Sequence, residues 1–152
     1  IGDIRTGDIM SIALTAAETG QLVIANLHTI STSHTIERVV NFFQPHQHAE
    51  MRMQLSLLLK GIMSLRLVPL QDATGRMPAS EVLIPTPTII ELIREGKIHE
   101  IEYYIKDGGM YGMQTFNQVL LDLYRAGKIT KEVAVNFAEK KDELIMGLKE
   151  LR

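Results

Sequence analysis

The chain has 152 residues, of which 45% are hydrophobic. It can therefore bury one core or two small ones, since domains commonly run to roughly 100 to 150 residues. Its 16 Lys and Arg residues against 18 Asp and Glu residues leave a net charge of -2, which excludes recognition of nucleic acid or an anionic membrane by bulk charge. The lack of cysteine excludes disulfides, thiolate metal sites and cysteine nucleophiles.

The first elements predict an α/β fold. Apolar residues at helical spacing predict a helix over 8–19, with Asp8 as its N-cap and Gly20 as its stop. The run 21–27 is short and apolar and ends at a polar cluster, which is typical of a strand buried on both faces of a parallel sheet. A helix followed by a buried strand indicates an α/β protein.

The middle of the chain predicts two further helices and two strands. Ser31, Thr32 or Ser33 caps a helix that reaches about Phe43, and a longer helix follows over 48–63. The segments 65–70 and 77–84 flank a turn-rich tetrapeptide, which predicts two antiparallel strands joined by a short loop.

Thr86 and Pro87 mark a boundary, with Thr86 as a cap and Pro87 at the first helical position. Every later segment is predicted helical, over 87–95, 98–106, 113–126 and 130–150. The expected organisation is therefore a mixed domain over 1–85 and a helical subdomain over 86–152.

The sequence contains no phosphate-binding loop of the G-x-x-x-x-G-K-[ST] type. Gly96-Lys97 and Gly127-Lys128 are each followed by isoleucine, and neither pair has glycine at the required earlier position. This chain alone therefore lacks the usual cradle for ATP phosphates.

Two polar residues lie at the predicted ends of apolar strands. Asp3 follows Ile1 and Gly2, where a carboxylate either orders water or magnesium, or caps a turn. His28 follows the predicted strand over 21–27, and open α/β sheets bind ligands at the carboxyl ends of their strands. The alternative for His28 is a residue that only caps a loop.

Two arginines are candidates for binding phosphate. Arg5 and Arg38 carry guanidinium groups, which neutralise phosphate charge with a fixed fork geometry. Solvated surface arginines are the alternative. His46, His48 and His99 are not accompanied by further ligands at a recognisable spacing, so no metal site is predicted from protein ligands.

Three strings resemble one family of motors, the PilT-like branch of the type IV pilus and type II secretion ATPases. They are L-T-A-A-E-T-G at 14–20, N-L-H-T at 26–29 and Y-G-M-Q-T at 111–115. The resemblance runs in the same order over nearly the whole chain, from the end of the Walker B segment onward. The family has a Walker A loop and an N-terminal PAS-like domain before this region, so we expect the chain to be part of a longer polypeptide.

The segment 88–97 resembles the A-I-R-N-L-I-R-E motif that the family associates with pilus retraction. Ile89 and the residues 92–95 match, whereas Thr88, Ile90 and Glu91 depart from it. Secretion-type relatives often carry a four-cysteine zinc element in this half, so the lack of cysteine favours the retraction branch.

The resemblance implies the C-terminal part of a RecA-like P-loop ATPase core over 1–85, followed by a small all-helical subdomain over 86–152. It gives Asp3 the place of the Walker B glutamate, with a side chain one methylene shorter, and makes His28 a γ-phosphate sensor. Thr29, beside His28, would take part in binding the nucleotide, and Arg5 and Arg38 would contact nucleotide phosphate or a neighbouring subunit.

The implied function is a hexameric motor that hydrolyses ATP to retract type IV pili and so drives twitching motility. ATP and Mg²⁺ would be its cofactors, and both would need the part of the protein that precedes this chain, which is expected to be inactive alone. The expected partners are five further copies and a platform protein of the inner membrane, without nucleic acid. The expected location is the cytoplasmic face of that membrane, reached only through partners.

The sequence is also compatible with two other functions. One is a non-hydrolytic module that binds motor subunits or a platform protein, which the missing phosphate loop and the aspartate at position 3 favour. The other is an ATPase of pilus extension or type II secretion, which would share the fold.

Overall fold

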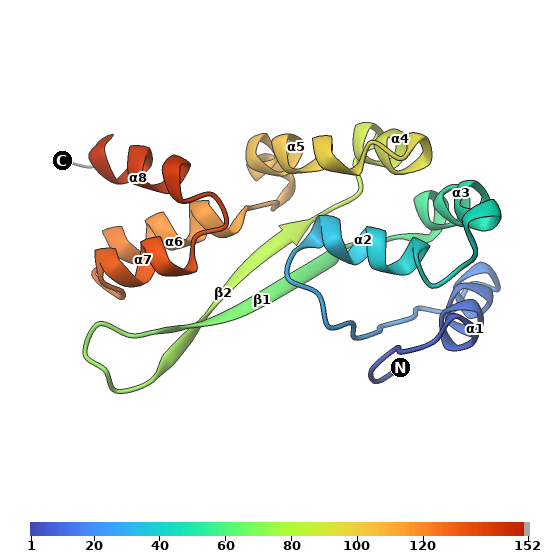
Figure 1. The fold of residues 1–152 in the computed structure, drawn as a ribbon, viewed down its shortest axis with the longest axis horizontal. Coiled ribbons are helices and arrows are strands. Elements are labelled where there is room, and N and C mark those ends of the chain that lie inside the picture. The colour runs from blue at the N-terminus through green and yellow to red at the C-terminus, as the bar shows by residue number, and fades with distance from the viewer. Residues whose placement is uncertain (151–152) are drawn as a thin grey trace. The chain divides into compact units, whose positions relative to one another are not determined.

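The computed structural model describes residues 1–150, which form helices and one two-stranded sheet (Figure 1). The strands β1 and β2 are joined as a hairpin by residues 70–75. The expected mixed class, with every element after Thr86 helical, is confirmed. The elements are α1 (Gly7–Glu18), α2 (Thr32–Val40), η1 (Pro45–Gln47), α3 (His48–Leu58), β1 (Ile62–Pro69), β2 (Arg76–Leu83), α4 (Pro87–Glu95), η2 (Ile98–Glu100), α5 (Ile101–Asp107), η3 (Gly109–Tyr111), α6 (Phe116–Arg125), α7 (Lys131–Phe137) and α8 (Lys141–Glu150).

The chain forms two compact units, and each is made of two separate segments. Unit 1 comprises Ile1–Ile62 with Leu83–Tyr104, and unit 2 comprises Met63–Val82 with Ile105–Arg152. These units follow spatial contacts, so they do not test the expected division at residue 86, which concerns a core and its appended subdomain. That division stays a prediction.

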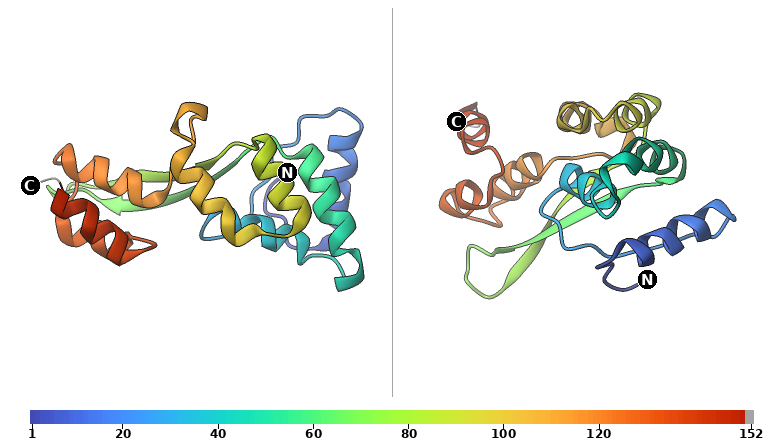
Figure 2. Two further views of the ribbon diagram at one scale, coloured as in Figure 1. Left: turned by 90° about the horizontal axis from the view of Figure 1, so that it is seen from above. Right: turned by 45° about the vertical axis from the view of Figure 1, so that its right-hand side comes forward.

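Unit 1 is built from helices that bury their apolar faces against one another. In it, α3 and α4 lie side by side (Figure 2, left). Threonine or serine hydroxyls cap three of its helices, Thr6 for α1, Ser31 for α2 and Thr86 for α4, and each accepts a hydrogen bond from a backbone amide of the first turn. Its buried apolar residues include Ile4, Met10, Ala13, Leu14, Ile36, Val39, Val40, Leu55, Ile89, Leu92, Ile93, Ile98 and Ile101.

Unit 2 packs α6, α7 and α8 against one face of the hairpin. Val68 and Ala79 of the hairpin join Leu120, Ile129, Ala134, Leu144 and Leu148 in a single hydrophobic cluster. Thr115 and Gln118 form a capping box at the start of α6, in which each side chain bonds the other residue's backbone amide. The hairpin, which ends at Leu83, is thus stabilised on this face by helices that begin only at Phe116.

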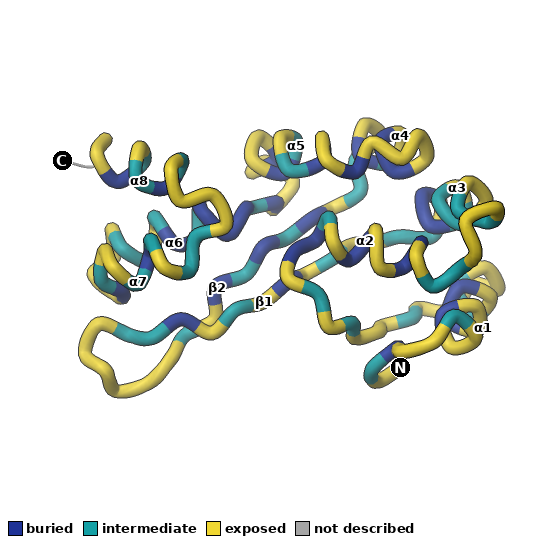
Figure 3. Tube along the Cα trace, viewed as in Figure 1, coloured by how far each residue is buried: buried dark blue, intermediate teal, exposed yellow. Residues whose placement is uncertain are grey.

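The expected buried strand over 21–27 is wrong. Leu22 and Ile24 are 80% and 76% exposed, and the segment forms only an isolated parallel bridge between Asp3 and Asn26 (Figure 3). A strand buried on both faces needs neighbouring strands and covering helices. Within residues 1–150, the segment bonds instead to the short extended run at the start of the chain, through Ile4 and Gly2.

Several helices differ from their expected bounds: α2 ends at Val40 instead of about Phe43, α6 begins at Phe116 instead of 113, and α1 and α3 differ as follows. The N-cap of α1 is Thr6, and Asp8 lies in its first turn, where an acidic side chain suits the helix dipole. Helix α3 ends at Leu58, because Leu59 adopts an extended backbone, and β1 begins where the helix was expected to continue.

The helix expected over 130–150 is two helices, α7 and α8. The buried side chain of Asn117 holds the break between them: its Nδ2 donates to the Lys140 carbonyl at 2.9 Å, and its Oδ1 accepts from the Glu139 amide at 3.1 Å. A helix ends where its backbone groups find other partners, and the side chain of Asn117, 22 and 23 residues away in the sequence, supplies them here.

Candidate functional site

Asp3, Arg5 and His28 meet where two extended segments of unit 1 run side by side. The parallel bridge between Asp3 and Asn26 aligns the segments, and the Ile4 amide donates to the Asn26 carbonyl at 3.0 Å. Because parallel segments end at the same edge, His28 comes to lie beside Asp3. The His28 Nε2 is 3.3 Å from the Asp3 Oδ2, and the Arg5 Nε donates to the same oxygen. We call these three residues the strand-end cluster.

The strand-end cluster is open to solvent at Arg5 and His28. The side chains of Arg5 and His28 are 78% and 77% exposed, whereas that of Asp3 is 20% exposed. The carboxylate is therefore largely shielded from solvent, whereas the two side chains that contact it are exposed.

The Arg5 hydrogen bond lowers the pKa of Asp3 below its ordinary value of 3.8. Partial burial of the carboxyl opposes this shift, while the charge of Arg5 and the contact with His28 add to the lowering. Asp3 is therefore ionised throughout the physiological pH range. An ionised carboxylate accepts hydrogen bonds from water and contacts hydrated Mg²⁺, which prefers oxygen ligands.

Replacing Arg5 by glutamine is expected to raise the pKa of Asp3 towards 3.8, because the first cause of the lowering is removed. In the unchanged chain the folded-state pKa is depressed, so the stability from this contact is present above pH 3.8 and is lost as pH falls through the folded value. Carboxyl ¹³C shifts followed by NMR during an acid titration measure both midpoints. Arg76→Gln in the hairpin is the control and should leave the Asp3 midpoint unchanged. Equal midpoints in Arg5→Gln and the unchanged chain would contradict the assignment.

The other two predicted site residues make different contacts. The Thr29 hydroxyl pairs with that of Thr35 on α2 at 2.7 Å. Arg38 is exposed on α2, and its guanidinium carbon lies 4.9 Å from the centre of the Phe42 ring. The structure therefore brings together three of the five predicted residues, and it places Thr29 and Arg38 in separate contacts of the same unit.

Ser31 is one of the three residues predicted as possible N-caps of α2, and it is confirmed as the N-cap, but none of the side-chain contacts of His34 and Thr35 was predicted. The Ser31 Oγ lies 2.8 Å from the His34 Nδ1 and also accepts from the His34 amide, while the Thr35 hydroxyl donates to the Ser31 carbonyl at 2.8 Å. The side-chain oxygen of an N-cap serine usually accepts a hydrogen bond from the backbone amide two or three residues later. That spacing was the signal available for Ser31, whereas no sequence pattern marked the pairing of Thr35 with Thr29.

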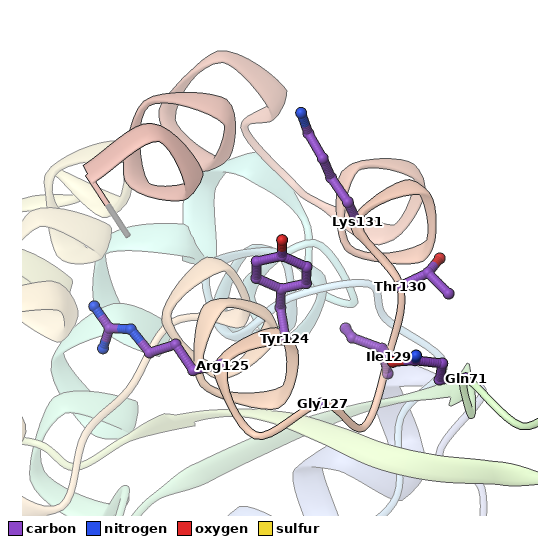
Figure 4. A pocket seen from close by; sticks show the side chains of 7 residues that line it. All are labelled: Gln71, Tyr124, Arg125, Gly127, Ile129, Thr130 and Lys131. Atoms are coloured by element: carbon purple, nitrogen blue, oxygen red, sulfur yellow. The ribbon is translucent and has the colours of Figure 1, made fainter. Parts of the chain in front are cut away.

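Unit 2 contains a pocket of about 620 Å³ that includes none of the predicted site residues. Its lining is Gln71, Tyr124, Arg125, Gly127, Ile129, Thr130 and Lys131. Figure 4 shows Arg125 on one side of Tyr124, and Gln71 and Thr130 on the other. Small-molecule sites place a few polar groups so that they converge on the ligand. The polar ends here point apart, so the pocket is not assigned a ligand.

Residues 1–135 match the family described as type II/IV secretion system protein. The chain belongs to this family. As a type II/IV secretion system protein, it is 40% identical over 149 residues to the type IV pilus ATPase PilU of Pseudomonas aeruginosa, a match that covers 98% of the chain and 39% of PilU. It is 41% identical over 134 residues to the type IV pilus retraction ATPase PilT of the same organism, covering 88% of the chain and 39% of PilT.

The fold agrees with a solved structure of the pilus retraction motor PilT with bound ADP. The TM-score is 0.84 at 40% identity, and the match covers 95% of this chain and 40% of that one. The type II/IV secretion system protein described here thus spans about two fifths of the length of the relatives that it matches. None of the helices formed by residues 1–150 combines the length and the apolar character needed to span a bilayer.

Proposed function

We propose that this chain is the C-terminal part of a hexameric ATPase that powers type IV pilus retraction. The observation that carries the proposal is the strand-end cluster, a carboxylate held by an arginine and a histidine in a chain 40% identical to PilU over 98% of its length. The likeness to PilT and PilU supports retraction over extension or secretion. Residues 1–85 would belong to a RecA-like core and residues 86–152 to a helical subdomain.

Asp3 would orient the water that attacks the γ-phosphate. Its Oδ2 is occupied by Arg5 and His28, so Oδ1 is the oxygen left for water or for a water ligand of Mg²⁺. The lowered pKa keeps the group ionised, as this role requires. Magnesium, when bound with nucleotide, would neutralise the charge on the phosphate oxygens.

The ring of His28 would sense the γ-phosphate, and Arg5 and Arg38 would neutralise the charge of that phosphate. The Nε2 of His28 faces Asp3, and its exposed ring can turn towards a phosphate at the same edge. Arg5 and Arg38 are both exposed, so neither has to leave a buried site to reach nucleotide. Guanidinium groups on phosphate supply charge-assisted hydrogen bonds of fixed geometry.

The residues present fit one side of a nucleotide site. They offer a carboxylate, an imidazole and two guanidinium groups, but the sequence contains no glycine-rich loop to hold the β- and γ-phosphates. We propose that a preceding part of the native polypeptide supplies that loop, and that this chain alone does not hydrolyse ATP. A ring of six copies at the cytoplasmic face of the inner membrane, bound to a platform protein, would couple hydrolysis to retraction.

Replacing Asp3 by asparagine in the native gene tests this function. Because the attacking water loses its negatively charged partner, we expect pili to remain on the cell while the frequency of retraction falls about 10²-fold. Retraction is counted by fluorescence microscopy of labelled pili, and twitching is scored on agar.

Asp72→Asn is the matched control, because Asp72 is also an aspartate of lowered pKa but bonds Thr74 in the hairpin loop. It should leave retraction unchanged. Normal retraction in the Asp3→Asn strain would contradict the proposal and favour a non-hydrolytic module. Loss of pili from the cell would instead indicate an extension motor.

A further inference from the structure

The threonine beside His28 uses both of its hydrogen-bond donors within the chain. The Thr29 amide donates to the Leu27 carbonyl at 3.2 Å, which closes a tight turn with His28 at its apex. The Thr29 Oγ1 lies 2.7 Å from the Thr35 Oγ1, a contact that does not by itself say which hydroxyl donates.

A second contact of Thr35 settles the direction. The Thr35 Oγ1 also lies 2.8 Å from the Ser31 carbonyl oxygen, which can only accept. A threonine hydroxyl has one proton. If Thr35 gives that proton to Ser31, Thr29 must donate to Thr35, and both short contacts are hydrogen bonds. The opposite direction would leave two oxygens 2.8 Å apart with no proton between them.

Thr29 consequently has no donor left for a phosphate oxygen, which only accepts hydrogen bonds. The anchor that it makes is shielded, since Thr35 is buried and Thr29 is partly buried. Thr35 and Arg38 lie three residues apart on α2, so they share one face of that helix. The hydroxyl pair therefore connects the turn that carries His28 to the helix that carries Arg38.

We propose that Thr29 and Thr35 are positioning residues whose hydroxyl pair fixes the His28 turn on α2, and that the Thr29 hydroxyl does not bind nucleotide phosphate. The part that concerns phosphate rests on the proposed function. The anchoring of the turn does not, because it follows from the contacts alone.

The anchoring is tested by NMR on this chain with Thr35→Val, which removes the hydroxyl and nearly keeps the shape. We expect the backbone order parameters of His28 and Thr29 to fall from about 0.85 towards 0.6. Thr35→Ser retains the hydroxyl and should restore them. Thr29→Val should lower the order parameter of His28 as Thr35→Val does. Because Thr29 is less buried than Thr35, this variant should disturb the core less.

Thr15→Val is the matched control, because the Thr15 hydroxyl donates to the carbonyl four residues before it, as that of Thr35 does, but without a second threonine. Its substitution should leave residues 28 and 29 unchanged. Unaltered order parameters in both Thr35→Val and Thr29→Val would overturn the anchoring.

The role towards phosphate is tested by ATP turnover of the native polypeptide. A positioning role predicts that Thr29→Val and Thr35→Val lower kcat by the same factor, about fivefold to tenfold, with KM for ATP unchanged. A larger loss or a raised KM in Thr29→Val alone would show that Thr29 binds phosphate, and would overturn that part. If the unchanged polypeptide shows no turnover, the proposed function fails, while the NMR result still decides the anchoring.

Discussion

Replacing His28 by alanine is expected to slow ATP hydrolysis by the native polypeptide by about 10² to 10³-fold. The imidazole is the group that we place against charge developing on the γ-phosphate, and removing one preorganised donor of this kind costs about that factor. The affinity for nucleotide should change little, since contacts to the phosphate loop and to the adenine ring supply most of the binding free energy. Steady-state release of phosphate measures kcat, and fluorescence titration with a labelled nucleotide measures affinity.

His99→Ala is the matched control for this experiment. His99 is also a solvent-exposed histidine of unit 1 beside a carboxylate, with its Nε2 3.8 Å from a Glu100 oxygen, and it lies outside the strand-end cluster. Its removal should leave kcat unchanged. Equal turnover in His28→Ala and the unchanged protein would contradict the sensor role, as would an equal loss in both variants.

Replacing Phe116 by alanine is expected to lower the free energy of unfolding of unit 2 by about 3 to 5 kcal/mol, the usual range for a buried phenylalanine. The ring is 1% exposed. It also supports the Arg66 guanidinium, whose carbon lies 3.9 Å from the ring centre and whose Nη1 donates to the Phe137 carbonyl. Removing the ring leaves a cavity. It also takes away the surface on which the Arg66 guanidinium stacks, and Arg66 joins the hairpin to α7. Urea unfolding measures the change.

Phe42→Ala controls for the general cost of removing an aromatic ring near an arginine. Phe42 is only partly buried, and the Arg38 guanidinium lies farther from its ring, at 4.9 Å. The loss in unit 1 should therefore be clearly smaller. A change below about 1 kcal/mol for Phe116→Ala would show that the ring does not fill the core as described.

Helices were predictable wherever their signals were local. The Thr86 cap and Pro87 gave both the start and the type of α4, because the hydroxyl bonds an amide only three residues away. The break between α7 and α8 could not be found this way, since the side chain that holds it is Asn117 of another helix. The hydrophobicity of Leu22 and Ile24 predicted burial, but both are exposed, because within residues 1–150 no strand or helix packs against them.

The candidate site was predictable to the extent that strand ends determine it. Asp3 and His28 were each placed after an extended segment, and the parallel bridge between those segments brings the two side chains together. The contact of Arg5 with Asp3 and the pairing of Thr29 with Thr35 depend on side-chain conformation in the folded chain. No spacing in the sequence encodes the direction of a hydroxyl hydrogen bond.

Asp3 and His28 are proposed to act together on one phosphate, and a double-variant cycle tests whether they do. Turnover of ATP is measured for the native polypeptide with Asp3→Asn, with His28→Ala and with both. Residues that work as a unit give non-additive losses. We expect the double variant to be about as slow as the slower single variant. Losses that multiply in the double variant would contradict this expectation, and would show that the two residues act independently.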